Sequence, residues 1–331
     1  RADQSVPVHP LHAMNLRQRC ITSPALAGVF ICAVLWLTGC ATPQVTSLQG
    51  QWPQDVPTQH QIAKVPFVAQ DDFECGPASL AMAFGAAGVQ VPLQTLVEQV
   101  YLPGRKGALQ VEMLATTRRN GLLPYVLPQT LSAVLREVAA GHPVIVFQNL
   151  SLPVYPVWHY AVVTGFDRDS STLRLHSGKS ENTEITFSTF ERTWARGEFW
   201  AMVALQPGDL PATAQPDPLV QSIAALERVN PAAARTAYTA ALRQWPAHKG
   251  LLLGQGNAAY ALGQFSAAQQ AYAQLVQAHP DFADGWNNLA QSLLDLNRRE
   301  EARQAIDKAI ALGGPRLGQY RELQRRLSAN P

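Results

Sequence analysis

Charge of either sign is scarce in this chain, and the two signs nearly balance. Only 15% of the 331 residues are Asp, Glu, Lys or Arg, and the net charge is +2. A charge this small creates no basic field that would attract a polynucleotide, so a nucleic-acid partner is not expected. Apolar residues make up 47% of the chain, which is enough for packed cores, and the length indicates two domains of ordinary size.

Long hydrophobic runs are also lacking, with one exception near the N-terminus. Arg17 and Arg19 precede ALAGVFICAVLWLTG, the apolar run from Ala25 to Gly39. A membrane-spanning helix needs about 18 or more such residues, so this shorter run is typical of a secretory signal peptide. The alternative is an uncleaved anchor helix. Met14 is the expected translation start, and residues 1–40 are then a non-native start plus the signal peptide.

The end of this run, Leu37-Thr38-Gly39-Cys40, resembles the lipobox of bacterial lipoproteins. In that family the cysteine receives diacylglycerol, the preceding segment is removed, and the acylated cysteine becomes the N-terminus. The resemblance implies lipidation at Cys40 and a protein of the bacterial cell envelope that is anchored to a membrane. Ala41 in the next position is compatible with the periplasmic side of the outer membrane.

Cysteine itself is scarce: Cys20, Cys32, Cys40 and Cys75 are all that the sequence contains. The first two fall in the segment expected to be removed and Cys40 is expected to be acylated, so only Cys75 keeps a thiol. Neither a disulfide within the mature chain nor a thiolate metal cluster is then possible, and no cofactor or metal is expected. A solitary thiol outside the cytoplasm, where cysteines are normally paired, calls for a functional explanation.

The remaining chain divides by composition into four parts. Residues 41–63 are polar and rich in Pro, Gln and Ser, which predicts a flexible tether. Residues 64–205 begin with helical spacing of apolar residues and continue with strand-like runs such as PVIVFQ and YAVVTGF, so an α+β domain is predicted. Residues 206–217 (QPGDLPATAQPD) are typical of a Pro-rich linker, and residues 218–329 have helical periodicity.

This C-terminal part contains an internal repeat. Pro246 and Pro280 are 34 residues apart, which is the tetratricopeptide period. Small and apolar residues recur in each frame at positions where paired helices must approach closely. The three frames start near Gln215, Lys249 and Ala283. They resemble two clear tetratricopeptide repeats preceded by a degraded one and closed by a polar helix over 316–327, which implies an all-α domain that binds a protein partner.

Cys75 lies in QDDFECGPASLAMAFG, between an acidic stretch and an apolar helical run. Pro77 suits the first turn of a helix, because its missing N–H would have no intrahelical partner there. A helix that begins at Cys75 directs its unpaired N–H groups and its dipole at the sulfur, which favours the thiolate. The alternative is a small buried cysteine without reactivity, which is the commoner role of any single cysteine.

Two residues elsewhere favour the reactive interpretation. Gln70 lies five residues before Cys75, where its side-chain amide is placed to donate to an oxyanion together with the backbone N–H of Cys75. His159 opens the strand-like run HYAVVTGFD, from which an imidazole can act as base and then as acid. The other histidines lie in the N-terminal segment, the tether, a turn or the repeats, and only His176 is comparably placed.

With their flanking residues, QDDFECGPASL and HYAVVTGFD resemble the papain-like cysteine peptidases of the bacteriocin-processing (double-glycine leader) family, over residues 64–205. The resemblance implies a papain-like fold and a cysteine endopeptidase in which Cys75 is the nucleophile, His159 the general base and Gln70 the oxyanion donor. Together with the lipobox and the repeats, the chain is similar to a stand-alone lipoprotein type of that family, which acts on a protein or peptide substrate.

One departure from the family pattern leaves two functions open. Family members carry Asp-Pro on the strand after the histidine, whereas this chain has His176, Ser177 and Gly178 there. The residue that orients the imidazole is then Ser177, Asn182, Asn149 or none. A missing orienter weakens control of the imidazole tautomer, so the alternative is a catalytically weak or inactive module in a lipoprotein adaptor that binds partners through its repeats. A cell-wall amidase is disfavoured, because papain-like enzymes of that kind show Asp-Cys-Ser-Gly around the thiol.

Overall fold

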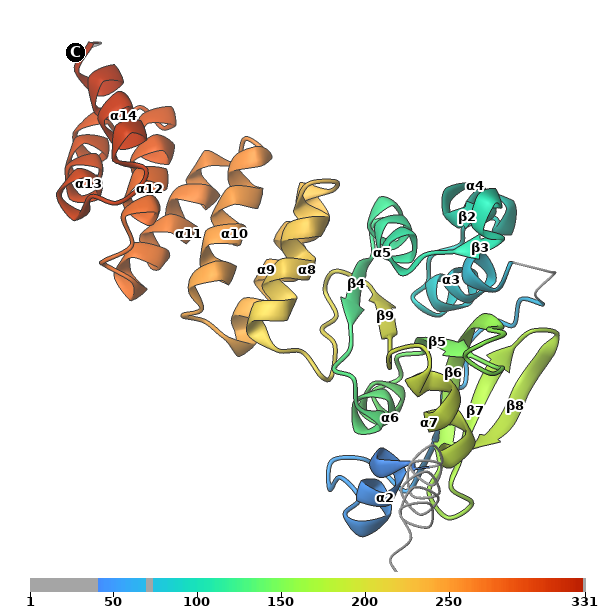
Figure 1. The fold of residues 1–331 in the computed structure, drawn as a ribbon. Helices are drawn as coiled ribbons and strands as arrows, with labels where there is room; N and C mark the ends of the chain where they lie inside the picture. The colour runs from blue at the N-terminus through green and yellow to red at the C-terminus, as the bar shows by residue number, and fades with distance from the viewer. Residues whose placement is uncertain (1–40, 70–73, 330–331) are drawn as a thin grey trace, which may run out of the picture. The chain divides into compact units, whose positions relative to one another are not determined.

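The structure is a computed structural model that describes residues 41–69 and 74–329. The expected signal peptide, Cys40 and Gln70 therefore lie outside the described residues. The described chain is an α+β domain followed by an all-α region of paired helices, which confirms the predicted fold class (Figure 1). None of its helices has the length and apolar character needed to cross a membrane.

A seven-stranded antiparallel sheet forms the centre of the α+β domain. Its strands follow the order β4-β9-β5-β6-β7-β8, and β1 pairs with the C-terminal end of β6. The strands are β1 (Gln59–Gln61), β4 (Leu123–Val126), β5 (Val144–Asn149), β6 (Trp158–Asp167), β7 (Thr172–Ser177), β8 (Ser180–Thr186) and β9 (Ala201–Leu205). A separate two-stranded ribbon consists of β2 (Tyr101–Leu102) and β3 (Gly107–Ala108), joined by the single turn η2 (Pro103–Arg105).

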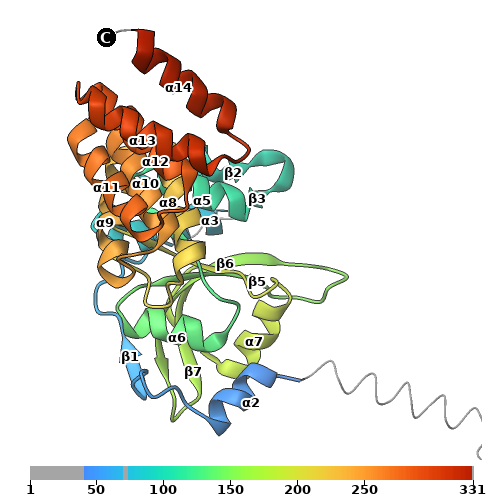
Figure 2. The same cartoon turned by 90° about the vertical axis from the view of Figure 1, so that its left-hand side faces the viewer.

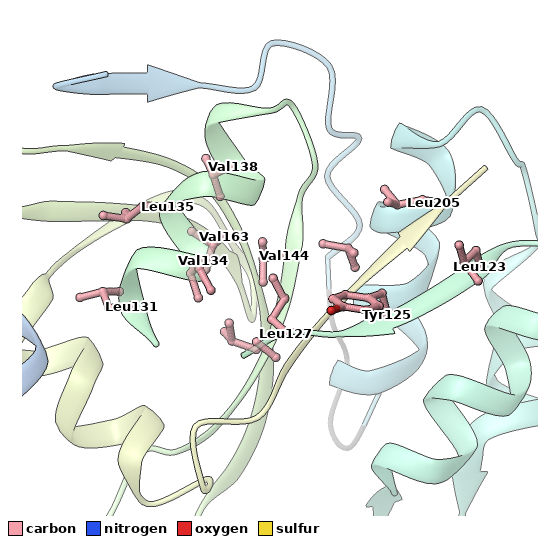
Figure 3. Packing of buried hydrophobic residues seen from close by; sticks show 14 of the residues in the cluster. Leu123, Tyr125, Leu127, Leu131, Val134, Leu135, Val138, Val144, Val163 and Leu205 are labelled. Carbon is pink, nitrogen blue, oxygen red and sulfur yellow. The ribbon is translucent and has the colours of Figure 1, made fainter. Parts of the chain in front are cut away.

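Helices cover both faces of this sheet (Figure 1). One face packs against α3 (Cys75–Ala86), α4 (Leu93–Val100) and α5 (Gln110–Arg119), and the other packs against α6 (Leu131–Ala139) and α7 (Phe187–Ala195). On β6, Tyr160 and Val162 belong to the core under α3, whereas Ala161 and Val163 belong to the core under α6, part of which is drawn in Figure 3. The central strand is therefore apolar on both faces, as the unbroken run YAVV indicates.

The segment predicted to be a flexible tether, residues 41–63, is instead folded onto the α+β domain. Helix α2 (Pro43–Gly50) forms there, and β1 adds a strand to the sheet. The backbone N–H groups of Gln44 and Val45 donate to the buried carboxylate of Glu191 on α7 at 3.0 and 2.8 Å, where the helix dipole also favours a negative charge. A few widely spaced apolar residues of this segment pack into the core of the domain. The segment is polar on average, so its composition did not indicate that it is folded. They are Val45, Leu48, Trp52 and Val56.

Three pairs of helices and a closing helix form the C-terminal region. The helices are α8 (Pro216–Glu227), α9 (Pro231–Gln244), α10 (Lys249–Ala261), α11 (Phe265–Ala278), α12 (Ala283–Asp295), α13 (Arg299–Leu312) and α14 (Leu317–Ala329). The first helix of each pair begins within a residue of its predicted frame. Gly256 on α10 shows why small residues recur, because a Cβ at this position would overlap the ring of Tyr272 on α11.

The Pro-rich segment 206–217 is fastened to the α+β domain by a buried carboxylate. Glu137 on α6 is fully buried, and its carboxylate accepts hydrogen bonds from the backbone N–H groups of Ala212 and Thr213 at 3.1 and 2.7 Å. The Thr213 hydroxyl donates to the same carboxylate at 2.6 Å, and Nδ1 of His142 lies 2.7 Å from it. The segment is thus an ordered connection that is held by hydrogen bonds to the Glu137 carboxylate.

Replacing this carboxylate should destabilise the fold. Glu137→Ala should lower the free energy of unfolding by about 3 kcal/mol, because buried N–H groups lose a charged acceptor. The control is Glu184→Ala, whose side chain is 58% exposed and pairs with Arg174 on the surface; that change should lower the free energy by less than about 1 kcal/mol. Urea denaturation followed by circular dichroism measures the stability of both variants. Equal midpoints for Glu137→Ala and Glu184→Ala would show that the Glu137 carboxylate does not stabilise the attachment of segment 206–217.

Candidate active site

Cys75 is the first residue of α3, the helix that packs directly on β6. The helix is apolar around its whole circumference, and the residues from Gly76 to Leu80 are all buried. Glycine is required after the cysteine, because a Cβ on Gly76 would lie only 2.6 Å from the Cβ of Ala108 on β3. Small side chains therefore let the beginning of α3 approach the sheet and carry the sulfur to the strand.

His159 is the second residue of β6. The next residue, Tyr160, contacts the cysteine through its backbone. The backbone of Tyr160 hydrogen-bonds to the Cys75 thiol, which places the sulfur beside the strand that carries His159. The Tyr160 hydroxyl donates to the carbonyl of Ala108 at 3.2 Å, so the same residue also holds the β2–β3 ribbon against the helix start. Cys75 and His159 line one cavity.

A serine occupies the place of the orienting carboxylate. Nε2 of His159 lies 2.9 Å from the hydroxyl oxygen of Ser177, the last residue of β7. The other two candidates have different partners: the side-chain oxygen of Asn149 accepts from two backbone N–H groups of the β5–β6 connection, and the backbone N–H of Asn182 donates to His176. Of the three candidates that the sequence left open, Ser177 is therefore the one that contacts the imidazole.

Burial favours the neutral forms of both reactive groups. It raises the pKa of the Cys75 thiol, and the backbone hydrogen bonds of Tyr160, Gly76 and Cys75 itself, which lower that pKa, are the smaller effect. Burial also lowers the pKa of the His159 imidazole, because desolvation penalises the charged form in each case. The sequence led us to expect a lowered thiol pKa at the helix start, but desolvation outweighs the backbone hydrogen bonds there and the pKa is raised instead.

The cavity that holds these two side chains has a volume of about 1030 Å³. Its lining includes residues 105–109, in the β2–β3 ribbon and just after it, and residues 156–160, where the β5–β6 connection enters β6. Trp158 stacks on Phe147 with ring centroids 5.1 Å apart. The charged residues of the described lining are Arg105, Lys106 and Lys179, and no Asp or Glu is among them.

His176, the second histidine that the sequence placed favourably, serves the fold. It is buried, its Nε2 lies 3.4 Å from the carbonyl oxygen of Val65, and its Nδ1 accepts from Asn182 at 3.3 Å. Gln70 lies outside the described residues, so its assignment stays a prediction. In residues 41–69 and 74–329, no three His, Cys, Asp or Glu side chains gather in a way that could hold a metal ion.

Sequence reasoning missed the walls of the cavity. The β2–β3 ribbon is too short to show a strand period, and the run LSLPVYPVW, which ends on the first residue of β6, receives no prediction from the sequence. The signal that could have drawn attention to this run is the lack of any charged residue from Pro143 to Trp158.

Comparisons with known proteins agree with this architecture. Residues 54–202 match the Peptidase_C39 like family, and residues 219–263 and 253–316 match the tetratricopeptide repeat. Among curated proteins, no sequence matches the chain.

Three solved structures illustrate the likeness. A putative C39-like peptidase from Bacillus anthracis shares 16% identity over 45% of this chain and 98% of its own, with a TM-score of 0.38. The peptidase domain of Streptococcus ComA, a bi-functional ABC transporter involved in a quorum sensing pathway, shares 16% identity over 43% of this chain and 98% of its own, with a TM-score of 0.36. The Sgt2 tetratricopeptide domain from Aspergillus fumigatus shares 24% identity over 34% of this chain and 78% of its own, with a TM-score of 0.32.

The two family matches coincide with the two parts of the fold: one covers the sheet that carries His159 and the helix that begins at Cys75, and the other covers the paired helices. The chain thus consists of a peptidase C39-like domain followed by tetratricopeptide repeats.

Proposed function

We propose that the protein is a cysteine endopeptidase, anchored to a bacterial envelope membrane by a lipid on Cys40, whose repeats bind a protein partner or substrate. The observation that carries the proposal is the placement of Cys75 and His159 in one cavity, with the backbone of Tyr160 against the sulfur. The match to C39-like peptidases supports it. The lipobox-like sequence supports the anchor, and Ala41 after it is compatible with the periplasmic side of the outer membrane.

In this proposal His159 acts as a general base at the moment of attack. In the tautomer whose Nε2–H donates to the Ser177 hydroxyl, the lone pair is on Nδ1, and Nδ1 takes the thiol proton as the sulfur adds to the substrate carbonyl carbon. The oxyanion receives hydrogen bonds from the backbone N–H of Cys75 and the side-chain amide of Gln70. The imidazolium then gives its proton to the leaving amine, and water hydrolyses the thioester.

The neutral resting pair predicts a slow enzyme. A preformed thiolate–imidazolium pair would need charge stabilisation that neither the buried α3 nor the uncharged Ser177 hydroxyl provides. The charge separation therefore occurs during catalysis, where substrate binding and the oxyanion donors must offset it. Slow turnover suits the processing of a dedicated protein substrate, which the repeats would hold near the site.

Ser177 also favours the second function, an adaptor that binds partners through its repeats while its peptidase-like domain is weak or inactive. A serine hydroxyl orients the imidazole but does not stabilise its charged form as a carboxylate does. The two functions differ in one measurable property, the reaction of Cys75 with a peptide-like electrophile.

A peptidyl vinyl sulfone should label Cys75, and peptide mapping by mass spectrometry should locate the adduct there. Cys75→Ala should abolish the adduct, and His159→Ala should slow its formation by about 100-fold or more, because the base is lost. Gln70→Ala should reduce turnover of a cleavable substrate by about 100-fold. Cys40→Ala is the matched control and should leave labelling at Cys75 unchanged; a wild-type protein that is not labelled would support the inactive adaptor.

The role of Ser177 predicts a change in the pH profile of the labelling. Ser177→Ala should slow labelling about tenfold, the equivalent of one hydrogen bond. Ser177→Asp should raise the pKa of His159, because a carboxylate stabilises the imidazolium, and the acidic limb of the profile should move to higher pH. Ser170→Ala, in the exposed β6–β7 turn, should change neither. If the acidic limb of the pH profile is the same in Ser177→Asp as in the wild type, then residue 177 does not contact His159.

Alkylation by iodoacetamide tests the resting ionisation state. Because burial raises the pKa of the Cys75 thiol, the rate should climb with pH throughout the range from about 6 to 9, and at neutral pH it should be below that of the unfolded protein. A rate that is flat between about pH 6 and 8 would instead reveal a thiolate–imidazolium pair. Cys75→Ser provides the blank.

A further inference from the structure

The connection between β5 and β6 displays an apolar surface beside the site. Residues 150–158, called here the β5–β6 tip, contain more than half of the exposed large apolar residues of the described chain. Leu152 is 63% exposed, Val154 75% and Tyr155 78%, and Leu150, Val157 and Trp158 are each about half exposed. Single exposed apolar residues are ordinary, but a contiguous group of this kind indicates a contact surface.

Hydrogen bonds hold the tip in one conformation. The side-chain oxygen of Asn149, which is 1% exposed, accepts from the backbone N–H groups of Ser151 and Val157 at 3.0 and 2.9 Å. Leu150 N–H donates to the Val157 carbonyl at 2.9 Å, and Tyr155 N–H donates to the Leu152 carbonyl at 3.1 Å. The apolar side chains therefore project from an ordered hairpin and are not on a loop that collapses onto the protein.

Positive charge lies directly next to this apolar tip. Val157 and Trp158 share their cavity with Arg105, Lys106 and Lys179, and the lining residues that the structure describes include no Asp or Glu. The partner of this surface should then be apolar and anionic at once. A bilayer of anionic phospholipids has both properties at its surface, where Tyr and Trp rings and the long stems of Lys and Arg are most stable.

The shape of the tip favours a bilayer over a peptide. Leu152, Val154 and Tyr155 stand at the end of a hairpin with most of their surface free, so a bound peptide would cover little of them. A lipid surface surrounds a projecting side chain on all sides and buries it more fully.

Helix α7 places the tip near the beginning of the folded chain. Glu191 on α7 holds the first turn of α2, and the Arg196 Nε–H, one residue after α7, donates to the Asn149 carbonyl at the base of the tip at 3.1 Å. With a rise of 1.5 Å per residue, these two attachment points are separated by about 8 Å along the helix. Figure 2 shows α2 and the β5–β6 hairpin on either side of α7. The start of α2 and the tip can therefore reach one surface.

We propose that the β5–β6 tip is a membrane contact, with Leu152, Val154 and Tyr155 inserted at the headgroup–acyl boundary and Arg105 and Lys179 facing the lipid phosphates. This contact would add a second attachment to the membrane beside the lipid proposed on Cys40. The mouth of the cavity then lies at headgroup level, so a peptide bond cleaved there lies close to a membrane. The contact itself is independent of the peptidase activity.

The test uses residues 42–331, which form one compact unit, so that neither the signal segment nor Cys40 contributes. Flotation with vesicles should show binding to phosphatidylcholine mixed with phosphatidylglycerol, and much weaker binding to phosphatidylcholine alone. Leu152→Ser, Val154→Ser and Tyr155→Ser combined should weaken binding at least tenfold. Arg105→Glu with Lys179→Glu should remove the preference for anionic vesicles.

Matched controls come from the repeats, where Val229 is 52% exposed and Leu312 44%; replacing both with Ser should leave binding unchanged. Cys75→Ala should bind vesicles as the wild type does, which separates this test from that of the peptidase. Because Tyr155 is almost free of neighbours, Tyr155→Ser alone keeps the test valid if the triple variant does not fold. The proposal is overturned if the wild type does not bind vesicles, or if the tip variants bind them as well as the wild type does. A tip variant that changes only the KM for a peptide would instead assign the tip to peptide docking.

Discussion

The direct packing of α3 on β6 is the constraint from which both the position and the chemistry of Cys75 follow. No side chain separates the helix start from the β2–β3 ribbon, because Gly76 leaves room for Ala108, and the backbone of Tyr160 meets the sulfur. Withdrawing α3 from the sheet would expose the core to which Leu80 belongs. The burial that fixes the sulfur also removes the water that would stabilise a thiolate, so a precise position and a neutral thiol have the same origin.

The contact between His159 and Ser177 separates orientation from charge stabilisation, two effects that a carboxylate combines. A hydroxyl at 2.9 Å holds the ring in place, but it can accept from Nε2 or donate to it, so it does not decide which ring nitrogen carries the proton. It does not offset the positive charge that the imidazole acquires when it takes the thiol proton. In the proposed mechanism the oxyanion donors stabilise only the negative charge that develops on the substrate, so the imidazolium has no anionic partner among its described contacts. This difference separates the proposed peptidase from the proposed adaptor.

Features that depend on local periodicity could be predicted from the sequence, whereas those that depend on long-range contacts could not. The separation of Pro246 and Pro280 located the repeats, and the run YAVV located a strand buried on both faces. Helix α2 escaped notice because its burial depends on a few apolar residues and on a carboxylate about 150 positions away. Ser177 could only be one of several candidates, because its approach to His159 depends on the irregular register between β6 and β7.

The raised pKa of Cys75 also affects how long the thiol survives. Peroxide attacks thiolates far faster than thiols, and the first product, a sulfenic acid, proceeds to irreversible acids when no second cysteine is present to form a disulfide. Cys75 is the only cysteine in the described residues, so no neighbouring sulfur there could rescue it. A sulfur that stays protonated in the resting protein resists this damage, so the burial of α3 also protects the thiol from oxidation.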